Sequence, residues 1–132
     1  ELLRATSGTT QMTDDYQRTL SARRNLEALR PLVEHCPRQI NVYTMLGANE
    51  QMIGRPAEAV ESYRQALAIS PRPEVYMEIG NLLVELGRID EAVDALVAAA
   101  RYDQLYLNSI QDPEVLRLVE TKMLEQDSAQ TR

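Results

Sequence analysis

The fold is decided by Tyr43–Ala66, YTMLGANEQMIGRPAEAVESYRQA, because the chain repeats this stretch at Tyr76–Ala99, YMEIGNLLVELGRIDEAVDALVAA. The two copies are offset by 33 residues, and eight of nine aligned key positions are identical. The aligned pairs are Tyr43/Tyr76, Leu46/Ile79, Gly47/Gly80, Gly54/Gly87, Arg55/Arg88, Glu58/Glu91, Ala59/Ala92, Val60/Val93 and Ala66/Ala99. A dense match at one period predicts a stack of repeated units. Such stacks usually present binding surfaces, so the repeat favours binding over catalysis.

Each copy predicts two helices joined by a turn at a glycine. Gly54 and Gly87 can adopt the left-handed conformation that ends a helix, and Pro56 suits the first turn of the helix that follows. The predicted helices span residues 39–52, 56–69, 74–86 and 90–102. The sequence therefore predicts an all-α fold of stacked antiparallel helical hairpins.

The flanking segments are assigned by composition. Residues 1–12 are polar, with Ser, Gly and Thr in the middle, which predicts a flexible tail or linker. Thr13, followed by two Asp, is typical of a helix start, and Pro31 predicts a kink or a break in the helix that follows. Whether residues 13–37 form one kinked helix or two stays open. Residues 103–111 are too apolar for a free loop, so we expect Leu105, Tyr106 and Leu107 to pack over the end of the stack.

Asp112-Pro113-Glu114 then predicts the start of a closing helix, because an open stack needs a cap with a polar outer face. The predicted domain covers residues 13–125. Its division is a tail at 1–12, a degenerate repeat at 13–37, repeats at 38–71 and 72–104, a capping helix at 112–125 and a frayed end at 126–132.

The composition is that of one domain of 132 residues with a net charge of −6. Residues 1–40 carry six Arg and five acidic residues, whereas residues 41–132 carry eight basic and fifteen acidic residues. An acidic domain repels phosphate backbones, so we expect no nucleic acid ligand. No apolar run is long enough to span a membrane, and the single Cys36 excludes an internal disulfide. Because the chain begins at Glu1 rather than Met, we expect it to be a piece of a longer protein.

The order of aromatic, glycine and alanine residues resembles that of tetratricopeptide repeat proteins. The matching residues are Tyr43-x2-Leu46-Gly47, Ala59-x3-Tyr63 and Pro71 in the first copy, and Tyr76-x2-Ile79-Gly80 with Ala92 in the second. In the second copy, Leu96 replaces the second aromatic residue and Gln104 stands where the family has a closing proline. The clear match covers residues 40–102. The resemblance implies a superhelix whose inner surface is lined by the first helix of each hairpin.

Carried onto this chain, that inner surface predicts a partner-binding groove of mixed polar and acidic character. Its methionines are flexible and adapt to different partners. The predicted groove residues are Asn41, Thr44, Met45, Ala48, Gln51, Met52, Glu74, Met77, Glu78, Asn81, Val84 and Glu85. Some members of the family hold a peptide's terminal carboxylate with Lys, Arg and Asn. Only Asn81 occupies such a place here, so we expect no binding of acidic carboxyl-terminal tails.

Three other side-chain clusters invite a chemical function, but each has a simpler structural interpretation. His35 and Cys36 are adjacent, yet neighbours on a helix point in different directions, and no second His or Cys completes a zinc site. Glu74 and Glu78 share a face, which suits a basic peptide better than a cation. The third cluster, Arg18, Arg23, Arg24 and Arg30, spreads over several helix faces, where solvated arginines are the commoner outcome. We therefore predict no catalytic residue, no metal and no cofactor.

These observations favour a non-catalytic protein-interaction scaffold that binds a peptide or protein partner, with basic segments suited to the acidic groove. Two alternatives stay open. One is a repeat module of a larger enzyme or membrane protein that positions a substrate or subunit. The other is a module that self-associates into a homo-oligomer through its end helices. An independent enzyme is the least favoured, because no triad, phosphate loop or metal set is present. The expected protein is soluble, in the cytoplasm or the periplasm.

Overall fold

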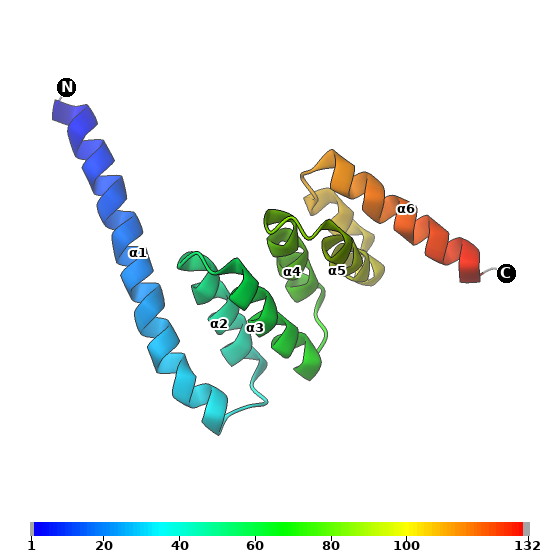
Figure 1. The fold of residues 1–132 in the computed structure, drawn as a ribbon, viewed down its shortest axis with the longest axis horizontal. Helices are drawn as coiled ribbons and strands as arrows, with labels where there is room; N and C mark the ends of the chain where they lie inside the picture. The colour runs from blue at the N-terminus through cyan, green and yellow to red at the C-terminus, as the bar shows by residue number, and fades with distance from the viewer. Residues whose placement is uncertain (1, 131–132) are drawn as a thin grey trace.

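The computed structural model describes residues 2–130, with side chains from residue 13 onward. Its elements in chain order are α1 (Leu2–His35), α2 (Ile40–Met52), α3 (Pro56–Ile69), α4 (Pro73–Glu85), α5 (Ile89–Tyr102), the 3-10 helix η1 (Gln104–Ser109) and α6 (Pro113–Gln130). No strand occurs in this described part of the chain. Figure 1 shows the hairpins α2–α3 and α4–α5 side by side between α1 and α6. The predicted all-α fold of stacked antiparallel hairpins is confirmed.

The two hairpin turns are built alike. Gly54 and Gly87 have φ angles of 78° and 75°, which glycine adopts without strain. The Gly54 N–H donates to the Gln51 carbonyl at 3.1 Å, and the Arg55 N–H donates to the Glu50 carbonyl at 2.9 Å. The second turn repeats both bonds. These bonds satisfy the last carbonyls of α2 and α4, which explains why the glycine recurs at the 33-residue offset.

Two further glycines allow the helices of each hairpin to approach closely. A Cβ added at Gly47 would lie 2.7 Å from Cζ of Tyr63, and one added at Gly80 would lie 2.5 Å from Cδ2 of Leu96. Carbon atoms pack at about 3.5–4.0 Å, so neither position accepts a larger residue without movement. Tyr63 and Leu96 therefore occupy equivalent places in the two hairpins.

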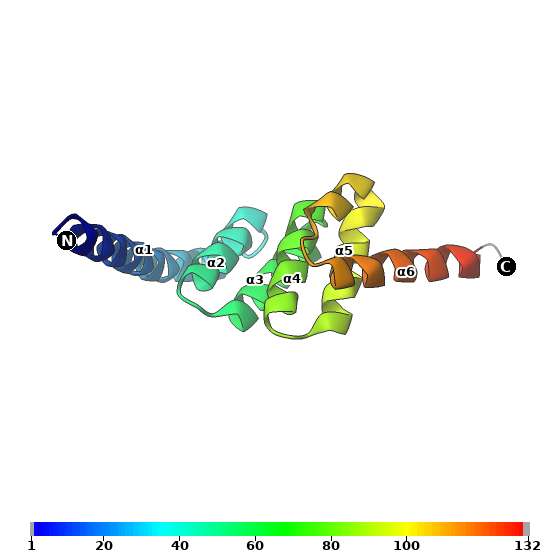
Figure 2. The same ribbon diagram turned by 90° about the horizontal axis from the view of Figure 1, so that it is seen from above.

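The core runs along the stack, because each helix packs mainly on its neighbours in the chain. One apolar cluster fills the space among α2, α3 and α4 and includes Tyr43, Tyr63 and Leu83. A second cluster joins α4 and α5 to η1 and α6 and includes Leu96 and Val119. Figure 2 shows α1 and α6 extending from opposite ends of this stack.

The N-terminal segment differs from the prediction. α1 is one helix from Leu2 to His35, so residues 2–12 do not form a linker and Thr13 does not begin a helix. The helix also continues through Pro31. Leu29 is buried and Val33 packs against the first cluster, so contacts on both sides of the proline hold the helix together. Pro31 itself is exposed, where water can satisfy the carbonyl that loses its N–H donor.

As a consequence, residues 13–35 contain no hairpin, and the degenerate repeat is not a two-helix unit. Only the second half of the degenerate repeat takes the place of a repeat helix, because α1 packs on α2 as α3 packs on α4. The open question between one helix and two is answered by a single helix.

Residues after α5 close the second cluster. Tyr106 and Leu107 pack against it, as predicted, but Leu105 is 69% exposed and does not. The Asp112 carboxylate accepts a hydrogen bond from the Glu114 N–H at 2.9 Å and so caps the start of α6. This cap agrees with the helix start predicted from the sequence.

α6 is longer than predicted and continues to Gln130 instead of fraying from residue 126. Arg101 of α5 holds its second half. The guanidinium donates to Asp127 at 2.9 Å, to the Met123 carbonyl at 3.2 Å and to Gln126 at 3.2 Å. Residues 131 and 132 of the predicted frayed end lie outside the described residues.

Candidate functional site

An open pocket of about 640 Å³ lies where α2, α3 and α4 meet. Its lining combines polar, acidic and apolar side chains from all three helices. The residues are Thr44, Ala48, Gln51, Met52, Tyr63, Glu74, Val75, Glu78 and Glu85. Most of them belong to the predicted groove, and Tyr63 and Val75 are additional. We call this the first pocket.

Tyr63 forms the base of the first pocket. Its side chain is 5% exposed, and its hydroxyl donates to Oε1 of Gln51 at 3.2 Å. Burial, followed by the negative charges of Glu78 and Glu50, raises the pKa of Tyr63 to about 12. The hydroxyl therefore stays neutral at ordinary pH and offers a hydrogen-bonding group at the base of an acidic pocket.

The acidic side of the first pocket is a stripe of three residues on α4, namely Glu74, Glu78 and Glu85. Their spacing places them on one face of the helix. All three are exposed, and none forms an ion pair within residues 13–130. The charge of this acidic stripe is therefore not neutralised by the chain itself.

On the surface formed by α3 and α5, in contrast to the acidic stripe, charged side chains form ion pairs. There Arg64 pairs with Glu61 at 2.9 Å and with Glu91 at 3.2 Å, and Arg88 also pairs with Glu91. Every ion pair among the described side chains involves α3, the turns that precede α3 and α5, or the helices α5 and α6. The carboxylates of the acidic stripe on α4 take part in none of these ion pairs.

A second pocket of about 390 Å³ lies between α4 and the start of α6. Its lining is Asn81, Val84, Glu85, Leu96, Ser109, Ile110, Gln111, Asp112 and Val115. Glu85 lines both pockets, so the two hollows adjoin at the end of α4. The residues on α4 were predicted from the sequence, but those at 109–115 were not, because the last helix was interpreted only as a cap.

Three predicted groove residues lie outside both pockets. Met77 is only 7% exposed and packs in the second core cluster, because η1 and α6 cover it. Its assignment to the groove surface is therefore wrong. Asn41 and Met45 are exposed on α2 but line neither pocket. Met52 lines the first pocket and also a hollow beside α1 that contains Arg18.

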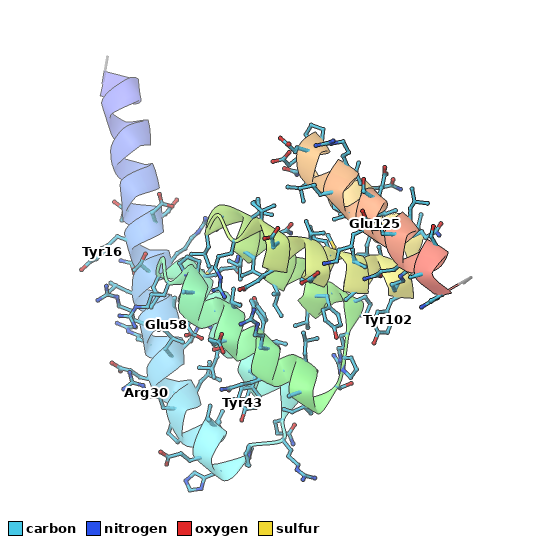
Figure 3. All side chains as sticks on the ribbon, turned by 45° about the vertical axis from the view of Figure 1, so that its right-hand side comes forward. Tyr16, Arg30, Tyr43, Glu58, Tyr102 and Glu125 are labelled. Carbon is cyan, nitrogen blue, oxygen red and sulfur yellow. The ribbon has the colours of Figure 1, made fainter. Side chains whose placement is uncertain are left out.

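The other clusters from the sequence are separate from the groove. His35 is exposed at the end of α1 and Cys36 is half-buried. Arg18, Arg23, Arg24 and Arg30 are exposed on α1, and Figure 3 shows Tyr16 and Arg30 projecting away from the hairpins. Over the described residues, no three His, Cys, Asp or Glu side chains gather as metal ligands would. None of the helices in that part of the chain has both the length and the apolar character of a membrane span.

Comparisons with known proteins agree with this architecture. A family model described as tetratricopeptide repeat matches residues 54–119. Among solved structures, the type III secretion chaperone SycD of Yersinia enterocolitica, in complex with a peptide of the translocator YopD, superposes with a TM-score of 0.62. Its sequence identity is 18%, and the alignment covers 89% of this chain and 90% of that one.

Two more solved structures share the fold. MamA has a TM-score of 0.62 at 25% identity, over 79% of this chain and 60% of that one. PcrH, in complex with the chaperone binding region of PopD, has a TM-score of 0.58 at 17% identity, over 100% of this chain and 96% of that one. In a comparison with curated proteins, no sequence matches this chain.

Proposed function

This chain belongs to the tetratricopeptide repeat family, and we propose that it is a non-catalytic scaffold whose groove holds an extended, cationic segment of a partner protein. The observation that carries the proposal is the acidic stripe Glu74, Glu78 and Glu85, which lines the first pocket and has no cationic partner among the described side chains. Lys or Arg side chains of a partner would complete these interactions.

The chemistry of the groove suits a polypeptide better than a small metabolite. Gln51 and Asn81 offer amide groups, and the Tyr63 hydroxyl, which is bonded to Gln51, lies at the base of the first pocket. Such groups can bond the backbone of a bound segment while the apolar surface contacts its side chains. The SycD and PcrH structures, which contain bound segments of other proteins, support a peptide ligand for this fold.

Electrostatic attraction would make the binding dependent on salt. Exposed ion pairs contribute about 0.2–1 kcal/mol each, and they are screened beyond a Debye length of about 8–10 Å at physiological ionic strength. Neutralising two of the three carboxylates is therefore expected to weaken binding by about two- to thirty-fold at low salt.

The test uses three fluorescent dodecapeptide pools that are matched in Gly, Ser and Leu content and carry Arg, Gln or Glu at the variable positions. Fluorescence anisotropy should give the order Arg, then Gln, then Glu for the wild-type chain. The variant with Glu74→Gln and Glu78→Gln should lose the preference for Arg. A matched control with Glu120→Gln and Glu125→Gln changes the net charge equally at exposed positions outside both pockets and should keep that preference. Equal binding of the Arg and Glu pools to the wild type would refute the proposal.

A further inference from the structure

The outer face of α1 carries a row of exposed charges of alternating sign. The row follows intervals of four, three and four residues, which keep to one side of a helix. Its members, which we call the alternating stripe, are Arg23, Glu27, Arg30 and Glu34. Figure 3 shows Arg30 projecting away from the hairpins, as does Tyr16, seven residues before Arg23, so the stripe faces away from the stack.

The charges of the alternating stripe are not neutralised within the described side chains. No ion pair among residues 13–130 includes any of the four. Along the helix, Arg23 precedes Glu27 and Arg30 precedes Glu34, and this order favours pairing less than an acid that precedes a base. The stripe lines neither pocket on α4, so a segment held in the groove would leave its charges unpaired.

The alternating stripe is complementary to its own reverse. Read from the other end, its intervals are again four, three and four residues, while every sign is exchanged. In two antiparallel copies of α1, Arg23 of one copy therefore faces Glu34 of the other, and Glu27 faces Arg30. A two-fold axis then passes between residues 28 and 29, and every charge of both stripes meets one of opposite sign. In a parallel pair in register, each residue would face its own copy, and like charges would repel.

The residues at the two ends of the stripe extend this match. Leu20 is half-buried and precedes Arg23 by three residues, and the exposed Pro37, in the turn after α1, follows Glu34 by three. The antiparallel arrangement brings Leu20 of one copy beside the turn that holds Pro37 of the other, at both ends of the contact. Apolar contacts would therefore flank the ion pairs.

We propose that a second copy of this chain docks antiparallel on the outer face of α1, through the alternating stripe, and forms a two-fold symmetric dimer. Both copies use the same surface, so the assembly closes at two and does not grow into a filament. This inference is independent of the proposed function, because the stripe shares no residue with either pocket of the groove. Exposed ion pairs are weak and are screened by salt, so the dimer should be sensitive to ionic strength.

The test measures self-association by sedimentation velocity over a concentration series. The wild-type dissociation constant should rise by at least about ten-fold between about 0.02 M and about 0.5 M NaCl. One variant, Arg23→Glu with Arg30→Glu, makes the stripe acidic, and another, Glu27→Arg with Glu34→Arg, makes it basic. Each variant alone should self-associate at least about ten-fold more weakly than the wild type, whereas a mixture of the two should form a heterodimer.

A matched control keeps the charge change but spares the stripe. Arg18→Glu with Arg24→Glu alters exposed residues of α1 outside the stripe, so this variant should dimerise as the wild type does. Circular dichroism checks that every variant is folded. A wild-type chain that stays monomeric at about 1 mM in low salt, a control that dissociates as the acidic variant does, or a mixture that forms no heterodimer would each overturn the proposal.

The orientation of the two copies is measured by pulsed electron paramagnetic resonance. In a Cys36→Ser background, one spin-labelled cysteine replaces Ala28 or Gln17, which are exposed and lie outside the stripe. In the antiparallel dimer the labels at residue 28 lie near the axis. The labels at residue 17 should be about 35 Å apart along the helix, from about 23 residues at about 1.5 Å each. Equal distances at the two positions would indicate a parallel pair and refute the arrangement.

The groove variant separates this proposal from the proposed function. Glu74→Gln with Glu78→Gln should lose the preference for the Arg peptides but dimerise as the wild type does. If it abolished self-association instead, the copies would be joined through the groove, and the docking on α1 would be refuted. Failure of every peptide to bind would refute the groove function and leave the dimer to be decided by the stripe variants.

Discussion

The Gly80→Ala substitution tests whether the close approach of α4 and α5 requires glycine. Its effect on stability should depend on whether Leu96 is present. In an isolated helix the substitution would stabilise by about 1 kcal/mol, because alanine is the better helix former. Here the new Cβ would lie 2.5 Å from Cδ2 and 2.7 Å from Cγ of Leu96, which is 1% exposed, so the Leu96 side chain would have to shift. Overpacking of this kind costs about 1–3 kcal/mol. We therefore expect a net destabilisation of about 0–2 kcal/mol.

The same substitution should change sign when the obstructing side chain is removed. Leu96→Ala alone costs about 2–5 kcal/mol, because it leaves a cavity in the second core cluster. Without the Leu96 Cδ2 and Cγ atoms, the new Cβ has no neighbour nearer than the Ala92 carbonyl oxygen at 3.6 Å, an ordinary contact, so Gly80→Ala should stabilise the fold by about 1 kcal/mol in that background.

Urea denaturation followed by circular dichroism measures all four proteins, at low temperature or in sucrose if the Leu96→Ala variant is marginal. The expected coupling energy between the two positions is about 1–3 kcal/mol. Stabilisation by Gly80→Ala in the wild-type background, or the same effect in both backgrounds, would show that glycine is not required there by close packing.

Three further predictions concern the turns, α6 and pH. Gly87→Ala meets no atom within 4 Å but must keep a φ near 75°, so it should cost about 1–2 kcal/mol from backbone strain alone; an unchanged midpoint in thermal unfolding would contradict this. Arg101→Ala should speed hydrogen exchange at 123–130 while α4 stays protected, and unchanged exchange there would show that the Arg101 hydrogen bonds do not hold the second half of α6. Burial raises the pKa of Glu50, with the nearby Glu58 adding to the rise and the Ser62 hydrogen bond opposing it, so ionised Glu50 destabilises the fold. The Glu50→Gln variant should therefore gain stability relative to the wild type as the pH rises from below 4.5, the pKa of this carboxyl in the unfolded chain, through its raised pKa in the folded chain. A gain that appears only at acid pH would contradict this prediction.

The helices of the two repeats could be predicted because their ends depend on local chemistry. α3 spans the predicted residues 56–69, since Pro56 suits its first turn and Ser70-Pro71 ends it. α1 could not be predicted in the same way. Its first residues contain Ser, Gly and Thr, which disfavour helix locally, but a helix already held by Leu29 and Val33 extends at low cost.

The groove was predictable only where it follows the repeat. The three residues of the acidic stripe were among the predicted groove residues and line the pockets together, because one helical face is shared by residues three, four and seven apart. Met77 was misplaced because its burial depends on η1 and α6, which belong to no repeated segment. The loop at 109–112 likewise has no counterpart in the first copy, so sequence periodicity carried no information about its place beside α4.

The packing of each helix mainly on its neighbours in the chain has an evolutionary consequence. A hairpin of this kind is joined to the rest of the molecule by two interfaces, one on each side, and the repeated Gly, Tyr and Ala positions make those interfaces similar. Duplication or loss of one 33-residue segment would therefore leave every other interface intact. Each added hairpin would lengthen the stack by one unit. The length of the stack in such a lineage can thus change by whole genetic units, while a single substitution such as that of Tyr63 by Leu at the equivalent Leu96 changes the packing within one hairpin.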